Sequence, residues 1–106
     1  LEQINALERI ARFYQSLLWN SEEGKPALDY LKKRGLSENT IKSFELGYAP
    51  ASLQLLLKKI GHDAHLMSLL EKSGILISKQ NHYHARFFNR IMFPIRNKRS
   101  QIIGFG

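Results

Sequence analysis

The chain of 106 residues is long enough for one domain with a modest core, and a hydrophobic content of 43% argues against disorder. It has no cysteine, which excludes disulfides and thiolate metal sites, and no apolar run reaches the roughly 18 residues of a membrane span. The net charge of +7 lies entirely in residues 72–106, which hold seven Lys or Arg and no acid, so a polyanionic partner is expected.

Three helices are predicted in the first half of the chain. Apolar residues at helical spacing indicate the first over residues 2–19. Pro26 suits the first turn of the second helix, because its missing N–H needs no partner there. Gly35 suits the end of that helix, because glycine readily adopts a left-handed backbone. Ser37 is then expected to cap the third helix with its hydroxyl group.

The second half of the chain is predicted to change from helices to strands. The elements expected there are two helices and three strands, at residues 52–60, 64–72, 75–77, 90–96 and 101–105. Gly61 separates the two helices, and the last two strands are expected to pair antiparallel. Helices followed by a small antiparallel sheet predict an α+β fold, which we expect to form a single domain over residues 1–106.

Residues 90–96 alternate with the period of a half-buried strand. We expect the side carrying Ile91, Phe93 and Ile95 to be buried, so that Arg90 and Arg96 point together to solvent. Pro94, on the same side as these arginines, cannot donate to a sheet ladder, which predicts an edge strand or a bulge.

The basic run at residues 86–99 is the strongest functional signal. Its candidate phosphate contacts are Arg86, Arg90, Arg96, Lys98 and Arg99, with Asn89 as a weaker candidate. Phe87 and Phe88 offer stacking surfaces for bases, but core packing is the more ordinary role of such aromatic residues. A second group, Lys32, Lys33 and Arg34, closes the second helix, where cations also stabilise the helix dipole.

Metal and catalytic sites have little support in this sequence. His62, His65, His82 and His84 lack the cysteines or carboxylates that a zinc site usually needs, so we expect surface histidines. Two-metal nucleotidyl transfer requires several carboxylates around Mg²⁺, and residues 72–106 contain none. The chain is therefore expected to bind no metal and to be inactive alone.

Two stretches resemble the bacterial DnaG-type DNA primase family. One runs from Tyr30-Leu31 through Arg34-Gly35-Leu36 to Gly47-Tyr48-Ala49-Pro50, and the other from Arg86-Phe87 through Met92-Phe93-Pro94-Ile95-Arg96 to Gly104-Phe105-Gly106. The resemblance implies the N-terminal basic subdomain of the polymerase core, with Arg34, Arg90 and Lys98 at positions that line the template groove. Phe88 departs from the family pattern, because many relatives carry a basic residue there. Ser100 departs as well, because it replaces a turn glycine.

The same resemblance implies the setting of the whole protein. DnaG primases are nucleotidyltransferases that make RNA primers on single-stranded DNA at the replication fork, in the bacterial cytoplasm. The template and primer, the TOPRIM subdomain and the replicative helicase are then the expected partners. Mg²⁺ and Zn²⁺ are expected outside this segment.

Two other functions remain open from the residues alone. Residues 26–44 could form a helix-turn-helix that binds duplex DNA, reading bases with Asn39, Lys42 and Ser43. The basic face could instead dock an acidic protein surface. Affinity for single-stranded against duplex DNA distinguishes the first from a primase fragment, and the salt dependence of DNA binding distinguishes the second.

Overall fold

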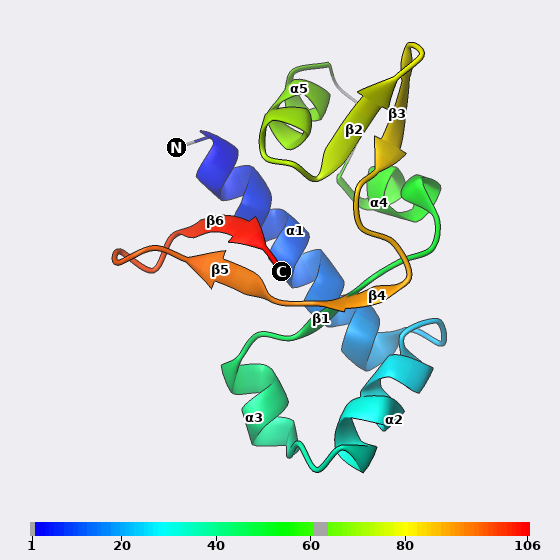
Figure 1. Cartoon of the computed structure of the whole chain (residues 1–106), viewed down its shortest axis with the longest axis vertical. Helices are drawn as coiled ribbons and strands as arrows, with labels where there is room; N and C mark the ends of the chain where they lie inside the picture. Colours follow the sequence, from blue (N-terminus) through cyan, green and yellow to red (C-terminus); the bar gives the residue numbers. More distant parts are fainter. Residues whose placement is uncertain (1, 61–63) are drawn as a thin grey trace.

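The computed structural model describes residues 2–60 and 64–106, which form a flattened body with extents of 42 × 32 × 19 Å. In chain order the elements are α1 (Glu2–Asn20), α2 (Lys25–Lys33), α3 (Glu38–Ser43), β1 (Gly47–Ala49), α4 (Leu53–Ile60), α5 (Ala64–Lys72), β2 (Leu76–Lys79), β3 (His82–Ala85), β4 (Arg90–Met92), β5 (Pro94–Arg96) and β6 (Ile102–Phe105). The predicted α+β fold is confirmed, with helices dominating the first part of the chain and strands the last (Figure 1). The predicted break at Gly61 lies outside the described residues.

Helix α1 is the centre of the core, and it contacts β1, α2, α4, α5 and β6. Its buried side chains are Ala6, Leu7, Ile10, Ala11, Phe13, Tyr14, Leu17 and Leu18. A Cβ atom on Gly47 would lie 2.6 Å from the Cβ of Tyr14, so only glycine lets β1 approach the helix this closely. Burial also raises the pKa of Tyr14 to about 12, because the phenolate form would lose its hydration.

The helix ends follow the sequence signals. Pro26 lies in the first turn of α2, and Gly35 follows that helix with φ +92°. The Ser37 hydroxyl oxygen accepts a hydrogen bond of 3.1 Å from the Thr40 N–H, as expected of a cap. Glu45 takes the corresponding left-handed position after α3, with φ +56°, although it is not glycine.

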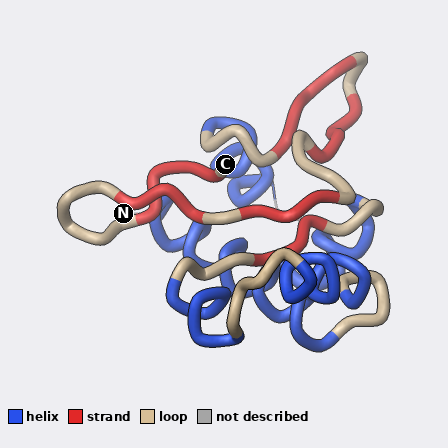
Figure 2. Tube along the Cα trace, turned by 60° about the horizontal axis from the view of Figure 1, so that its bottom comes forward, coloured by secondary structure: helices blue, strands red, loops and turns tan. Residues whose placement is uncertain are grey.

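The strands form three separate antiparallel pairs, β1 with β4, β2 with β3, and β5 with β6. The pairing of β5 with β6 was predicted, whereas β1 and β3 were not. Figure 2 shows β4, β5 and β6 running along one side of the helices, while the β2–β3 hairpin extends outward. Because every pair has two strands, Pro94 lies on an edge strand, as predicted, although the sheet irregularity falls between Ile95 and Arg96.

The predicted direction of residues 90–96 was wrong from Met92 onward, whereas Arg90 is exposed as predicted and Ile91 is half-buried against the core. Met92 is only 1% exposed, whereas Phe93 is 47% and Ile95 44% exposed. The segment also changes partner at Phe93, from β1 to β6, so it is two short strands rather than one. Both sides of the segment carry apolar residues, and alternation alone therefore could not tell which side packs on the helices.

Candidate nucleic-acid interface

Arg86 and Arg90 both approach the aromatic ring of Phe87. Their guanidinium carbons are 5.7 Å and 5.9 Å from the centroid of Phe87, within the range of cation–π attraction. Phe87 itself is half-buried and packs against the core. Both arginines are exposed, and within the described part of the chain neither forms an ion pair with an acid. We call these three residues the arginine pair and its ring.

Asn89 has a structural role in the folded chain. Its side-chain oxygen accepts a short hydrogen bond from the hydroxyl group of Tyr48, a buried residue of β1, and its own backbone is left-handed with φ +53°. Asparagine tolerates this conformation better than most residues. The bond anchors the segment that carries the arginine pair and its ring to the neighbouring strand.

The turn between β5 and β6 presents two more cations, Lys98 and Arg99, and both are exposed. The side-chain oxygen of Asn97 accepts hydrogen bonds from the backbone N–H groups of Arg99 and Gln101, at 2.9 Å and 3.0 Å. Ser100 completes the turn with φ +62°, the position where a glycine is common in such three-residue hairpins. The turn therefore holds its two cations on a defined backbone.

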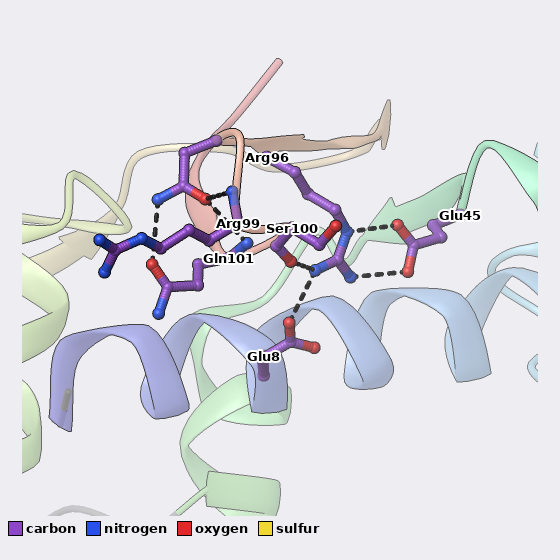
Figure 3. A network of polar contacts seen from close by, with 7 residues as sticks. Glu8, Glu45, Arg96, Arg99, Ser100 and Gln101 are labelled. Carbon is purple, nitrogen blue, oxygen red and sulfur yellow. Dashed lines mark hydrogen bonds and ion pairs between the residues drawn. The ribbon is translucent and has the colours of Figure 1, made fainter.

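The prediction that Arg96 points freely to solvent was wrong (Figure 3). Its guanidinium donates two hydrogen bonds to the Glu45 carboxylate, at 2.8 Å and 2.7 Å, and one of 2.8 Å to Glu8 of α1. It also donates to the backbone carbonyl of Ser100. These bonds hold the pKa of Glu45 below its ordinary value, and they raise that of Arg96. The side chain joins β5 to α1, and two carboxylates already occupy its guanidinium group.

The end of α2 presents a third basic group. Lys33 and Arg34 are exposed, and the Arg34 guanidinium lies 6.0 Å from the centroid of the Tyr30 ring. Lys32 instead forms an exposed ion pair of 3.1 Å with Glu38. Arg34 and Lys33 are therefore the cations of this group that remain open to an outside partner.

Phe88 is exposed, contrary to the core packing expected of it. Its side chain is 60% exposed, and it lines an open depression of about 350 Å³. Tyr83, on the unpredicted strand β3, lines the same depression and is 37% exposed. Sequence analysis missed Tyr83, because its neighbours His82 and His84 were considered only as possible metal ligands and strand β3 was not predicted.

No group of three or more His, Cys, Asp or Glu that could hold a metal occurs among residues 2–60 and 64–106. His62 lies outside that part of the chain. His65 forms a hydrogen bond with Glu2 of α1, and His82 and His84 are exposed on β3.

The helix-turn-helix alternative is poorly supported by α2 and α3. Helix α3 has only six residues, and the ammonium group of Lys42, its one cation, lies 5.1 Å from the centroid of the Trp19 ring. At 1.5 Å per residue such a helix is about 9 Å long, which leaves little length for a row of base contacts.

Comparison with protein families finds a match over residues 13–106 to the model described as DNA primase catalytic core, N-terminal domain. The DNA primase of Geobacillus stearothermophilus is 42% identical over 97 residues, which is 91% of this chain and 16% of that protein. The chain therefore spans about a sixth of the length of such relatives.

Solved structures agree with this match. One described as the DnaG primase catalytic domain bound to ssDNA superposes with a TM-score of 0.88 at 35% identity, over 97% of this chain and 32% of that one. The RNA polymerase domain of Mycobacterium tuberculosis DnaG, in complex with a double-stranded DNA oligomer with a 6-nucleotide overhang, gives a TM-score of 0.81 at 28% identity. This match also covers 97% of the present chain and 32% of the Mycobacterium tuberculosis chain.

Proposed function

This chain belongs to the family of N-terminal domains of the DNA primase catalytic core, and we propose that it binds the single-stranded DNA template during primer synthesis. The arginine pair and its ring carry the proposal. Both guanidinium groups are exposed and have no acidic partner among the described residues. Each contacts the ring of Phe87, which is held in place by its packing against the core. Arginine matches phosphate oxygens through two-point hydrogen bonds, and most affinity for a single strand comes from such contacts.

Lys98, Arg99, Lys33 and Arg34 extend the proposed interface. All four are exposed, and Lys98 and Arg99 lie in the turn between β5 and β6. Figure 1 shows that this turn is at the end of the hairpin away from β4. Asn89 and Arg96 would have a structural role beside this interface. Asn89 accepts a hydrogen bond from Tyr48, and Arg96 forms ion pairs with Glu8 and Glu45. Lys32 is a weaker contact, because Glu38 already neutralises it.

For the whole protein we propose the activity of a primase, a DNA-directed RNA polymerase that makes RNA primers at the replication fork. Relatives named DNA primase support this role, and this chain spans about 16% of their length. The carboxylates for Mg²⁺, the zinc-binding segment and the contact with the replicative helicase would then belong to parts outside these residues. Such an enzyme would work in the bacterial cytoplasm, and no described helix is long and apolar enough to cross a membrane.

The TOPRIM subdomain is the partner we propose for the outer side of the β5–β6 hairpin. Phe93, Ile95 and Ile103 are 47%, 44% and 57% exposed there. A group of large apolar side chains on one hairpin is typical of an interaction surface. The solved catalytic domains that match this chain are about three times as long as the matching part, which supports an intramolecular partner. The 106 residues would then act as one unit of that core.

Salt-dependent binding tests the proposal. We expect micromolar or weaker affinity for a labelled single strand, with log affinity falling against log salt by about 0.7 for each phosphate contacted. Arg86→Ala should reduce that slope by about 0.7. Lys72→Ala, which removes an exposed cation at the end of α5, is the matched control and should leave the slope unchanged. A slope near zero for the unmodified chain would instead favour docking to an acidic protein surface. Tighter binding to a duplex of the same length would favour the helix-turn-helix alternative.

A further inference from the structure

Phe88 and Tyr83 form an aromatic surface beside the arginine pair and its ring. Together with Ala51, Leu53, His84 and Ala85 they line one open depression. An apolar ring that is 60% exposed gains little for the folded chain, because most of its surface remains in water. Such a ring would contribute more to stability if another flat group covered it in a complex.

The backbone on both sides of Phe88 is anchored. The Arg86 N–H donates a hydrogen bond of 2.9 Å to the Ile75 carbonyl, before β2, and Asn89 accepts from Tyr48 of β1. Between these anchors Phe87 packs toward the core. The adjacent side chain of Phe88 is thereby held outward, over the depression. An aromatic side chain has only two rotatable bonds, so a surface held in this way loses little entropy when it is covered.

The positive charge around Phe88 indicates what kind of partner covers its ring. Residues 72–106 contain no acid, and Arg86 and Arg90 lie on both sides of Phe88 in the sequence. On the other side of the depression the Glu23 carboxylate accepts a hydrogen bond of 3.0 Å from the N–H of Ala51, so this acid already has a partner within the chain. An aromatic ring between cations is typical of proteins that bind single strands, where bases stack on the ring and phosphates meet the charges. A neutral apolar partner would leave these guanidinium groups without a counter-charge.

We propose that an unpaired base of the bound strand stacks on Phe88 in the depression shared with Tyr83, while Arg86 and Arg90 hold the flanking phosphates. The inference rests on the proposed function and adds a contact to the bases themselves. Because every base has a flat face, this contact would bind without strong sequence preference. It also gives the exposed ring of Phe88 a role of its own.

The test compares a thymidine oligonucleotide with an abasic strand of equal length and charge, using Phe88→Ala and Phe88→Trp. We expect Phe88→Ala to weaken binding of the thymidine strand by about 5- to 100-fold and to leave the abasic strand unchanged. Phe88→Trp should restore the affinity. Thermal melts should not change much, because the side chain is largely exposed. If Phe88→Ala does unfold the chain, Phe88→Leu keeps an apolar side chain without the flat ring and should show the same selective loss.

Arg90→Ala separates the inference from the proposed function, because it should weaken both strands alike. If Phe88→Ala leaves both affinities unchanged, or weakens both equally, the stacking proposal is wrong although phosphate binding stands. If the unmodified chain binds neither strand in a salt-dependent way, the proposed function itself fails.

Discussion

Arg90 owes its exposure to its place at the start of β4, on the Phe87 ring, and not to the strand direction that the alternation predicted. We expect Arg90→Ala to lower affinity for single-stranded DNA by about 10- to 100-fold, because a charge-assisted contact contributes roughly 1.5–3 kcal/mol. The free energy of unfolding should change by less than about 0.5 kcal/mol. Titrations at one salt concentration and thermal melts measure the two effects.

Met92→Ala is the control for that substitution, because Met92 is buried in the core at 1% exposure. Its loss should cost about 2–5 kcal/mol of stability. Binding per folded molecule should be nearly unchanged. If Arg90→Ala were to unfold the chain as Met92→Ala does, without changing binding per folded molecule, Arg90 would be a structural residue.

Arg96 is expected to behave in the opposite way. Arg96→Ala leaves the carboxylates of Glu8 and Glu45 without their shared partner, which should cost about 1–3 kcal/mol of stability. Affinity of the folded fraction for DNA should change little. Denaturant unfolding combined with a binding titration checks both parts, and a stable variant with weakened binding would return Arg96 to the interface.

The pH dependence of stability also tests whether the ion pair of Glu45 and Arg96 stabilises the fold. The folded-state pKa of Glu45 lies below its ordinary value of 4.5, because Arg96 stabilises the carboxylate. The pair therefore stabilises the fold above pH 4.5, and this contribution disappears as the pH falls through the lower folded-state pKa. Arg96→Ala should therefore reduce the loss of unfolding free energy that the chain shows as the pH falls below 4.5. An unchanged curve would show that the pair contributes nothing.

At the scale of elements, the turn of the β5–β6 hairpin holds one residue in a strained backbone conformation. Ser100 adopts a left-handed backbone at φ +62°, which costs a residue with a Cβ about 1 kcal/mol more than glycine. Ser100→Gly should therefore raise stability by about 0.5–1 kcal/mol, measured by chemical unfolding. The Ser100 carbonyl that accepts from Arg96 remains in the variant. Lys98→Gly, at an exposed turn position without a positive φ, is the control and should not stabilise the chain.

At the scale of the whole molecule, we expect the 106-residue chain to synthesise no RNA. Nucleotidyl transfer needs carboxylates around Mg²⁺, and the described residues contain no group of acids and histidines that could hold one. A primer-synthesis assay with template, nucleotides and Mg²⁺ checks this expectation. Template-dependent product from the purified chain would contradict it, and addition of the rest of the catalytic core should restore synthesis if the family role holds.

Local signals in the sequence determined the helices and the β5–β6 pairing. Helical spacing indicated α1, Gly35 ended α2, and Ser37 capped α3, because each of these effects acts within a few residues of the chain. The basic segment and its family resemblance were equally visible, since both are properties of residue order. Local sequence therefore decided the fold class and the family.

Tertiary structure alone decided which basic residues are available. The sequence placed Arg90 and Arg96 on one face, but Glu8 and Glu45, which bind Arg96, lie 88 and 51 residues away in the chain. Phe88 and Tyr83 meet in one depression only because β3 folds back on β2 and Asn89 anchors to β1. Alternation fixes which residues share a side of a strand, but the direction of that side depends on the helix that packs there and on the charges it carries.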